Sequence, residues 1–453
     1  MIRVMISAPN SGSGKTAIVC GLLNLLHRRG YHLCALKCGP DYIDPMFHRS
    51  VLGVESHNLD SYLSSPDQMR ALFARSVSGH DAVVCEGAMG FYDGVGGVTT
   101  QASAWEAADI LGFPVVLVVR PKGNSLTLAA QIQGLCRFRQ PSHIAGVILN
   151  DCSEMLYRTL SPMLERETGL AVLGYLPHMA DAQFESRHLG LYTAQEITDL
   201  DWKIRQIADQ MERTIDIPRL LSLCHSGGIE HRIPKPLPNP TVRIALANDE
   251  AFCFTYEENK EELRAQGAEL VEFSPIHDTK LPDSVHALYL PGGYPELYAK
   301  QLSENRSMRE SIRMACGNGL PTIAECGGFL YLGDSLVDSA GNSYDMAGFL
   351  NGRGIPRGRL VRFGYAELTA KSDSMLFRAG EKIRTHEFHH WDSTENGDGL
   401  DAVKPQTGRS WSCGIATETL YAGFPHLYFA GNPALAARFV EAARRYKEAK
   451  HEA

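Results

Sequence analysis

A phosphate-binding loop is predicted near the start of the chain, where residues 8–16 read APNSGSGKT. Glycines let backbone N–H groups approach phosphate oxygens, and the N-terminus of the helix that follows adds positive potential. Lys15 is expected to contact the β- and γ-phosphates and Thr16 to ligate Mg²⁺. Pro9 stands where the usual pattern has its first glycine. The loop residues expected to bind ATP are Gly12, Ser13, Gly14, Lys15 and Thr16.

A second chemical centre is predicted around Cys326, in the sequence TIAECGG (322–328). Two glycines behind a strand-end cysteine are typical of a tight turn that projects a nucleophile, although a lone buried thiol is more often inert. Because a thiol near pH 7 is mostly protonated, it needs a base, and His426 in FPHLY (424–428) is the candidate. Gly293, in PGGYPE (291–296), and Gly327 are the expected oxyanion-hole residues.

Two further stretches offer hard oxygen ligands after predicted strands, KCGPDYIDP (37–45) and CEGAMGFYDG (85–94). Mg²⁺ prefers oxygen ligands, and open α/β sheets bind ligands at the carboxyl ends of their strands. Asp41 and Glu86 are therefore candidate metal ligands. On residue types alone, either stretch could also be an ordinary Asp/Gly turn.

The sequence HEFHH (386–390) matches the zinc motif H-E-x-x-H. That motif requires a helix, so that both histidines share one face. The flanking residues predict a strand instead, which would split the ligands, so no zinc site is expected here.

Composition limits the classes of function. The chain has 453 residues, which suits two or three domains, and its formal charge of −8 argues against nucleic-acid binding. Its first residues run directly into a predicted strand without a signal-peptide pattern, and no apolar run is long enough to span a membrane. Eleven irregularly spaced cysteines indicate reduced thiols. We therefore expect a cytoplasmic protein without a membrane anchor.

Alternating strand and helix patterns must position these residues. Apolar strand candidates at 2–8, 31–37, 81–85, 115–119 and 144–149, with a helix at 16–29, predict a doubly wound parallel α/β sheet. The segment IPKPLPNP (233–240) has proline at every second position and predicts an extended linker. A second α/β unit follows, with strands at 242–247, 268–273, 287–290 and 321–324. The predicted division is 1–215, a linker at 216–240, and 241–453.

The chain resembles the cobyrinic acid a,c-diamide synthase family over nearly its whole length. The motifs that carry the resemblance, in family order, are KCGPDYIDPMFH (37–48), SHNLDSYL (56–63), EGAMGFYDG (86–94), LPGGYPELYA (290–299), AECGGFLYLG (324–333) and HLYFAGNPALAARFV (426–440). The resemblance implies a dethiobiotin-synthetase-like ATPase domain joined to a class I-like glutamine amidotransferase domain. It implies a carbon–nitrogen ligase that uses ATP, Mg²⁺ and glutamine to amidate the a and c acetate side chains of a corrin.

The resemblance also implies roles for single residues. Asp41 and Glu86 correspond to carboxylates of the metal or substrate site, with Lys37 and Tyr42 beside the substrate. Asp93 corresponds to a residue needed for carboxylate activation, and Asn150 to a position that reads adenine. Cys326 would be the glutaminase nucleophile and His426 its base. Ordinary class I glutaminases carry a glutamate two residues after this histidine, where this chain has Tyr428; the residue that orients His426 is therefore open.

The same residues are also compatible with other functions. The substrate could be hydrogenobyrinic acid or a nickel sirohydrochlorin, or the activity could be that of a cobyric acid synthase. From another class, a ParA/MinD-like ATPase that binds a partner protein would need a second loop lysine, where this chain has Asn10 and Ser11. The sequence leaves a homodimer open.

Overall fold

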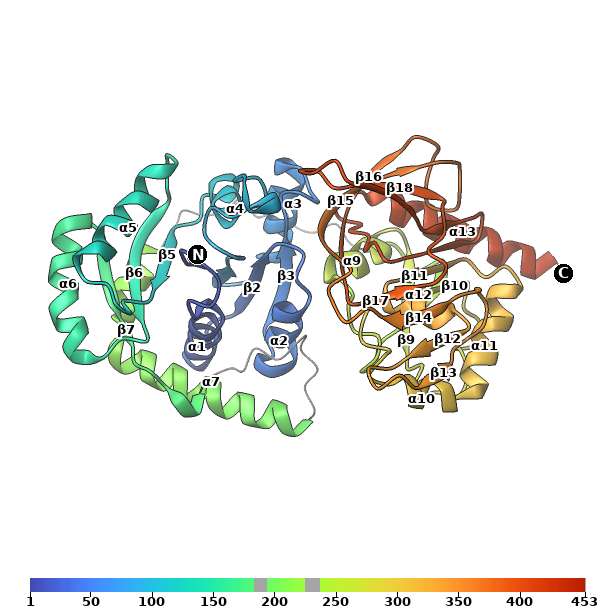
Figure 1. Cartoon of the computed structure of the whole chain (residues 1–453), viewed down its shortest axis with the longest axis horizontal. Coiled ribbons are helices and arrows are strands. Elements are labelled where there is room, and N and C mark those ends of the chain that lie inside the picture. Colours follow the sequence, from blue (N-terminus) through green and yellow to red (C-terminus); the bar gives the residue numbers. More distant parts are fainter. Residues whose placement is uncertain (183–193, 225–236, 453) are drawn as a thin grey trace. The chain divides into compact units, whose positions relative to one another are not determined.

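The computed structural model describes residues 1–182, 194–224 and 237–452, and the chain forms two compact units, Met1–Pro234 and Lys235–Ala453 (Figure 1). Each unit contains a mainly parallel sheet with helices against it, as the sequence predicts. Within the described ranges, no helix is both long and apolar enough to cross a bilayer.

The first unit is built on a seven-stranded, wholly parallel sheet in the order β3-β2-β4-β1-β5-β6-β7. Its strands are β1 (Ile2–Ser7), β2 (Leu33–Cys38), β3 (Glu55–Leu59), β4 (Ala82–Glu86), β5 (Val115–Val119), β6 (Ile144–Asn150) and β7 (Ala171–Leu176). Strands β2, β4 and β5 are buried along their whole length, because helices cover both faces. The sheet confirms the predicted doubly wound architecture.

The helices of the first unit follow the strands in alternation. They are α1 (Lys15–Arg28), α2 (Ile43–Leu52), α3 (Pro66–Ser76), α4 (Ala104–Leu111), α5 (Leu126–Phe138), α6 (Glu154–Thr168), α7 (Ala194–Thr214) and α8 (Ile217–Leu223), with short 3₁₀ turns at Val95–Gly97 and Ala180–Ala182. Helix α1 places its apolar face in the core, and α7 packs so closely on it that a Cβ at Gly21 would lie 2.5 Å from the Met211 sulfur.

The structure differs from the predicted linker, 216–240, at its beginning. Helix α8 buries Ile217 and Leu220 in the first core, and the Cys224 carbonyl accepts a hydrogen bond from the Arg3 N–H (3.0 Å). Residues up to 224 therefore belong to the first unit. The apolar residues of this short helix indicate burial, but the prolines that follow favoured the prediction of a linker. The first half of the proline-rich segment, 233–236, lies outside the described residues.

The second unit contains a six-stranded sheet in the order β20-β21-β11-β10-β8-β9, parallel except for β20. Two four-stranded sheets, β13-β12-β14-β17 and β16-β15-β18-β19, accompany it. The strands are β8 (Val242–Ala247), β9 (Ala268–Phe273), β10 (Ala287–Leu290), β11 (Thr322–Glu325), β12 (Ser335–Val337), β13 (Ser343–Asp345), β14 (Arg353–Pro356), β15 (Arg362–Ala370), β16 (Lys382–His389), β17 (Trp391–Ser393), β18 (Leu400–Val403), β19 (Ser410–Cys413), β20 (Ile415–Ala416) and β21 (Leu420–Gly423). The helices are α9 (Glu257–Ala265), α10 (Ala299–Glu304), α11 (Arg306–Gly317), α12 (Gly327–Leu332) and α13 (Pro433–Glu452).

Candidate active site

The phosphate-binding loop connects β1 to α1, as the sequence predicts. Gly14 ends the loop with φ +94°, and a Cβ there would lie 2.1 Å from Nδ2 of Asn150. A residue with a side chain at position 14 would therefore be strained and would clash. Asn150, at the end of β6, donates a hydrogen bond to the Ser13 carbonyl (2.8 Å). The residue predicted to read adenine thus lies against the loop and holds its backbone.

Lys15 and Thr16 begin helix α1 and already have polar partners. Lys15 Nζ donates to the Met89 carbonyl (2.6 Å) and to the Asn10 carbonyl (3.2 Å) across the loop. Burial lowers the pKa of Lys15, and the negative charge of Glu86 opposes that shift. The Thr16 hydroxyl donates to Oε1 of Glu86 (2.7 Å). The loop and the end of β4 therefore form one polar site.

A cluster of charges surrounds Lys37, which pairs in register with Glu86 on neighbouring strands β2 and β4. Lys37 Nζ contacts the Asp44 carboxylate and lies 3.2 Å from Oε1 of Glu86 and 4.0 Å from Oδ2 of Asp41. Burial opposes the lysine charge, but Asp44 and Glu86 outweigh it and raise the pKa of Lys37 well above its usual range. Burial and the Asp44 carboxylate raise the pKa of Glu86 to about 7.

Asp44 is the member of this cluster that the sequence-based selection missed. It lies in the first turn of α2, three residues after Asp41, which lies just before the helix begins. Burial followed by Asp44 raises the pKa of Asp41 to about 6, while the ammonium of Lys37 holds the pKa of Asp44 down against its burial. Two aspartates three residues apart at a helix N-terminus could have indicated from the sequence that Asp44 belongs to this cluster. Tyr42, directly before α2, is buried.

The oxygen atoms here fit a magnesium ion. Glu86 is only 1% exposed, and its Oε2 atom has no hydrogen-bond partner among the described residues. An unpartnered buried carboxylate oxygen beside a threonine hydroxyl is a hard ligand set of the kind Mg²⁺ prefers. Asp41 lies beside Lys37, with its Oδ1 accepting from the Ile43 N–H (2.9 Å), so its place among the ligands stays a prediction.

Asp93 packs its loop against the phosphate-binding loop. Its Oδ2 accepts a hydrogen bond from the Gly90 N–H (3.0 Å), and a Cβ at Gly90 would lie 2.6 Å from the Pro9 carbonyl.

Arg120, which follows β5, also contacts the phosphate-binding loop. It donates to the Gly12 carbonyl (3.2 Å) and pairs with Asp151. Sequence reasoning missed Arg120, because only strand order places it beside the loop.

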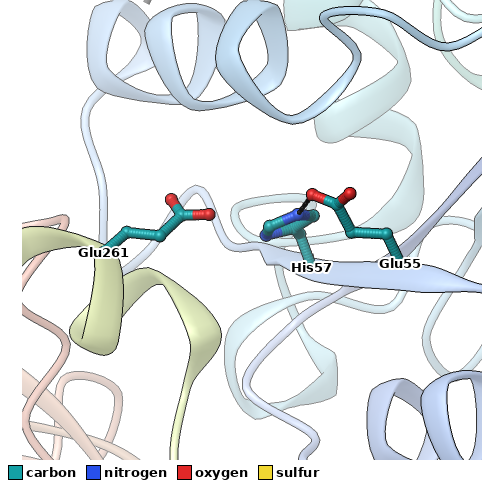
Figure 2. Close-up of side chains that lie close together, drawn as sticks. All are labelled: Glu55, His57 and Glu261. Atoms are coloured by element: carbon teal, nitrogen blue, oxygen red, sulfur yellow. Dashed lines mark hydrogen bonds and ion pairs between the residues drawn. The ribbon is translucent and has the colours of Figure 1, made fainter. Parts of the chain in front are cut away.

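Strand β3, whose sequence ESHNL has no apolar periodicity, was missed as a strand and supports this site. Asn58 donates from Nδ2 to the carbonyls of Gly39 (2.9 Å) and Asp41 (2.8 Å), which holds the loop that carries Asp41. On alternate positions of the same strand, His57 and Glu55 form a hydrogen bond of 2.9 Å (Figure 2), and this bond lowers the pKa of Glu55.

The second centre is built on Cys326, which lies in a sharp turn between β11 and α12. Its φ of +48° and ψ of −101° place a non-glycine residue in a strained conformation, as expected for a nucleophile turn. The Cys326 N–H donates to the Gly423 carbonyl (2.8 Å), which ties the turn to the end of neighbouring strand β21. The side chain is 8% exposed.

The structure brings His426 to this thiol from 100 residues away. The imidazole is 3% exposed, hydrogen-bonds Cys326, and has its Nδ1 3.6 Å from Oε2 of Glu325, an ion-pair separation. Burial alone would lower the pKa of His426, but Cys326 and Glu325 outweigh it and raise the pKa to about 10. The histidine is thus a cation paired with the nucleophile turn at neutral pH.

The predicted oxyanion-hole residues adjoin each other. A Cβ at Gly327 would lie 3.1 Å from the Gly293 nitrogen, so the two backbones pass in contact beside Cys326. At neighbouring Gly292, a Cβ would lie 2.6 Å from Cε1 of His426. A side chain at any of these positions would displace His426 or the backbone N–H groups beside Cys326, which is a physical reason for glycine there.

His386 belongs to strand β16, not to a helix, as predicted for the H-E-x-x-H sequence. Its carbonyl accepts a hydrogen bond from the His426 N–H (2.9 Å), so this strand supports the backbone of the base. Burial, followed by the charge of His426, lowers the pKa of His386 to about 3.

Tyr428 stands where ordinary class I glutaminases carry their glutamate. It is buried and packs edge-on against Tyr256 (5.0 Å between ring centres).

Comparison with known proteins matches both units. A family model described as the CobQ/CobB/MinD/ParA nucleotide binding domain covers residues 4–191, and one described as the CobB/CobQ-like glutamine amidotransferase domain covers residues 243–434. A cobyrinate a,c-diamide synthase of Listeria innocua is 38% identical over 98% of this chain and all of the relative. That of Salmonella typhimurium is 38% identical over 97% of this chain and 98% of the relative.

These similarities span both units and include both chemical centres, the phosphate loop with its carboxylates and the cysteine with its histidine. Relatives at this identity over nearly the full length share the fold and the order of domains. The chain therefore belongs to the cobyrinate a,c-diamide synthase family.

Proposed function

We propose that the chain uses ATP and glutamine to convert the a and c acetate side chains of cobyrinic acid, or of a closely related tetrapyrrole, to acetamides. The observation that carries the proposal is that each unit holds the parts of one half-reaction. The first has a phosphate loop beside buried carboxylates and a lysine, and the second has a thiol in a strained turn against a buried histidine.

The glutaminase half-reaction follows from Cys326 and His426. The thiol sulfur attacks the glutamine amide, while N–H groups at Gly293 and Gly327 stabilise the oxygen that becomes negative. His426 carries the proton to the leaving ammonia, and water then hydrolyses the thioester. The high pKa of His426 supports this role, because a cationic imidazole can protonate the leaving amine.

The synthetase half-reaction requires an activated carboxylate, since an oxide is a poor leaving group. We infer that phosphoryl transfer from ATP gives an acyl phosphate, which ammonia then attacks. Lys15 would stabilise the negative charge of the γ-phosphoryl group during transfer. Its ammonium now donates to the carbonyls of Met89 and Asn10, and it could donate to phosphate oxygens in their place. Thr16 and Glu86 would hold Mg²⁺, which neutralises phosphate charge when bound.

Lys37 and the carboxylates of Asp41 and Asp44 would face the substrate acid. An ammonium kept charged by the Asp44 and Glu86 carboxylates is a ready partner for the incoming carboxylate of the substrate. Asp93, fixed by Gly90 beside the phosphate loop, would assist activation of that acid, and Tyr42 would line the same region. Eleven free cysteines support placing the enzyme in a reducing cytoplasm.

The test is product mass analysis after incubation with ATP, Mg²⁺ and glutamine, using cobalt, nickel and metal-free tetrapyrrole acids in parallel. A gain of two amides on the cobalt corrin alone is expected. Two amides on the metal-free or nickel ring would reassign the substrate, and more than two would indicate a cobyric acid synthase.

A Cys326→Ala variant separates the halves. Glutamine-dependent product should fall by at least about 10³-fold, while amidation with a high concentration of ammonium salt stays within about threefold of wild type. Loss of the ammonia-driven reaction in a folded variant would contradict the division of labour.

An ATPase that binds a partner protein is the alternative from another class, because the nucleotide-binding family model also covers MinD and ParA proteins. That alternative leaves the strained Cys326 turn and the buried His426 without a purpose. Glutamine hydrolysis by the purified chain separates the two classes.

A further inference from the structure

Glu325 is a buried carboxylate that directly precedes the nucleophile. It ends β11 and is 1% exposed. A buried glutamate is costly unless its charge has a definite partner. The position where ordinary class I glutaminases carry their glutamate holds Tyr428, whose ring packs on Tyr256. A carboxylate at ion-pair distance from the imidazole of His426, that of Glu325, instead comes from strand β11.

Both oxygens of Glu325 are held in place. Oε1 accepts from the N–H of Leu427, the residue after the histidine (3.1 Å), and Oε2 accepts from the Tyr289 hydroxyl (3.2 Å). Oε2 is also the atom 3.6 Å from His426 Nδ1. One side chain thus contacts both the backbone that carries the histidine and the ring itself.

Asn259 continues this network behind the carboxylate. Its Nδ2 donates to the Leu427 carbonyl (2.8 Å) and to the Tyr289 hydroxyl (3.3 Å), and its Oδ1 accepts from the Phe429 N–H (2.7 Å). Three elements, α9, β10 and β11, therefore fix the position of the Glu325 carboxylate and of the segment that follows His426. Such a network limits rotation of the imidazole relative to the thiol.

We propose that Glu325 is the positioning residue of the glutaminase centre, which holds Nδ1–H of His426 so that Nε2 faces the Cys326 thiol. This assignment rests on the proposed function. Before the attack, Nε2 of His426 accepts the thiol proton, which gives a thiolate beside the imidazolium. When the sulfur attacks the amide carbon, the S–C bond forms, the C–N bond breaks, and the proton on Nε2 passes to the leaving ammonia. Water then cleaves the thioester, giving glutamate and restoring the thiol. The Glu325 side chain forms no covalent bond in these steps, and it stabilises the imidazolium.

Two roles of Glu325 must be separated, because an acceptor for the Leu427 N–H alone would be structural. Glu325→Gln separates them. Its amide oxygen can still accept from Leu427, but its NH₂ group would donate to Nδ1 of His426. That donation selects the tautomer with a proton on Nε2, which cannot take the thiol proton.

The experiment measures glutamine hydrolysis and ammonia-driven amidation by the full chain. For Glu325→Gln we expect kcat for glutamine hydrolysis to fall about 10²- to 10⁴-fold, with KM for glutamine within about threefold. Ammonia-driven amidation should stay near the wild-type rate. Glu325→Asp, which restores the charge on a shorter chain, should recover at least about tenfold of the loss.

Glu387→Gln is the matched control, since Glu387 is also fully buried in this unit and lies 3.8 Å from an arginine, Arg362. It should keep glutaminase activity within about threefold. Equal losses in both variants, or a Glu325→Gln enzyme with normal kcat, would overturn the assignment. The proposed function would survive either result if Cys326→Ala still lost glutamine-dependent amidation.

A second measurement reads the protonation of His426 in the wild-type protein. Nitrogen-15 NMR of histidine-labelled wild type reports which ring nitrogens of His426 carry protons, with His426→Asn used to assign the signal. We expect a proton on Nδ1 across neutral pH. A neutral ring protonated only on Nε2 would refute the role of Glu325.

Discussion

The two chemical centres differ in how their charges are compensated. Around the phosphate loop, Lys37 meets three carboxylates, and Glu86 meets both a lysine and a hydroxyl. Around Cys326, one histidine stands between one thiol and one carboxylate. The first arrangement can exchange partners when a polyanion, a metal and an acid enter. In the second, the hydrogen bonds of Asn259 and Tyr289 hold the carboxylate in place, as the proposed transfer of a single proton requires.

The comparison is tested most strongly at Lys15. Lys15→Ala removes the cation expected to follow the transferred phosphoryl group, so amidation with glutamine or with ammonia should fall at least about 10³-fold. Glutamine hydrolysis measured as glutamate release should continue, because Lys15 belongs to the first unit alone. Retained amidation with ammonia would show that the loop does not serve phosphoryl transfer.

Gly292→Ala tests the glutaminase centre. A methyl group would stand 2.6 Å from Cε1 of His426, so the ring must move and glutamine hydrolysis should fall about 10²-fold. The rate with ammonium salt should be unchanged. Gly317→Ala serves as the control, since a Cβ there has no neighbour within 4 Å. Equal activity of Gly292→Ala and wild type would mean that His426 is not held against this backbone.

A smaller effect is expected from pH. His426 has its pKa raised from 6.5 to about 10, so its cation is present at neutral pH and lost as pH rises through about 10. The groups that face it are Cys326 and Glu325 from the β11–α12 turn and His386 from β16. The kcat for glutamine hydrolysis should therefore hold across neutral pH and decline as pH rises through about 10. The fold stabilisation from this group is complete below pH 6.5 and is lost progressively as pH rises from 6.5 to about 10.

Glu325→Gln sharpens the pH comparison, since it removes one of the two interactions that raise the pKa of His426. The alkaline limb of the residual activity should move to lower pH. An unmoved limb would mean that the Cys326 thiol alone sets the titration of the histidine.

The smallest effect is expected at Asn150. Asn150→Ala removes the 2.8 Å hydrogen bond to the Ser13 carbonyl, worth about 1 kcal/mol, so KM for ATP should rise about fivefold with kcat nearly unchanged. Comparing ATP with GTP separates this effect from adenine reading: a change in nucleotide preference indicates contact with the base, and a uniform rise indicates loop support alone.

Much of the fold was predictable from local pattern. The apolar runs of β1, β5 and β6 predict buried parallel strands, and the turn at Gly12–Lys15 follows from glycine, serine and lysine spacing within a few residues. Strand β3 was not predictable in this way, since its buried positions carry the polar residues His57 and Asn58. Asn58 is accommodated there by hydrogen bonds to the carbonyls of Gly39 and Asp41 in the loop after β2. Helix α8 was predicted as part of the linker for a similar reason. Its apolar side chains are buried only because they pack on the core of the first unit, and the local sequence does not show that contact.

The amino-acid sequence by itself determined the phosphate loop and the turn at Cys326, because backbone conformation at glycines and strand ends depends on neighbouring residues. It offered His426 only as a candidate partner of the thiol. Only the tertiary structure decided which carboxylate serves which cation. Lys37 meets Glu86 through the register of β2 and β4, and Glu325 meets His426 because β11 lies beside β21. Such pairings depend on strand order and register across about 50 to 100 residues, and no local spacing encodes them.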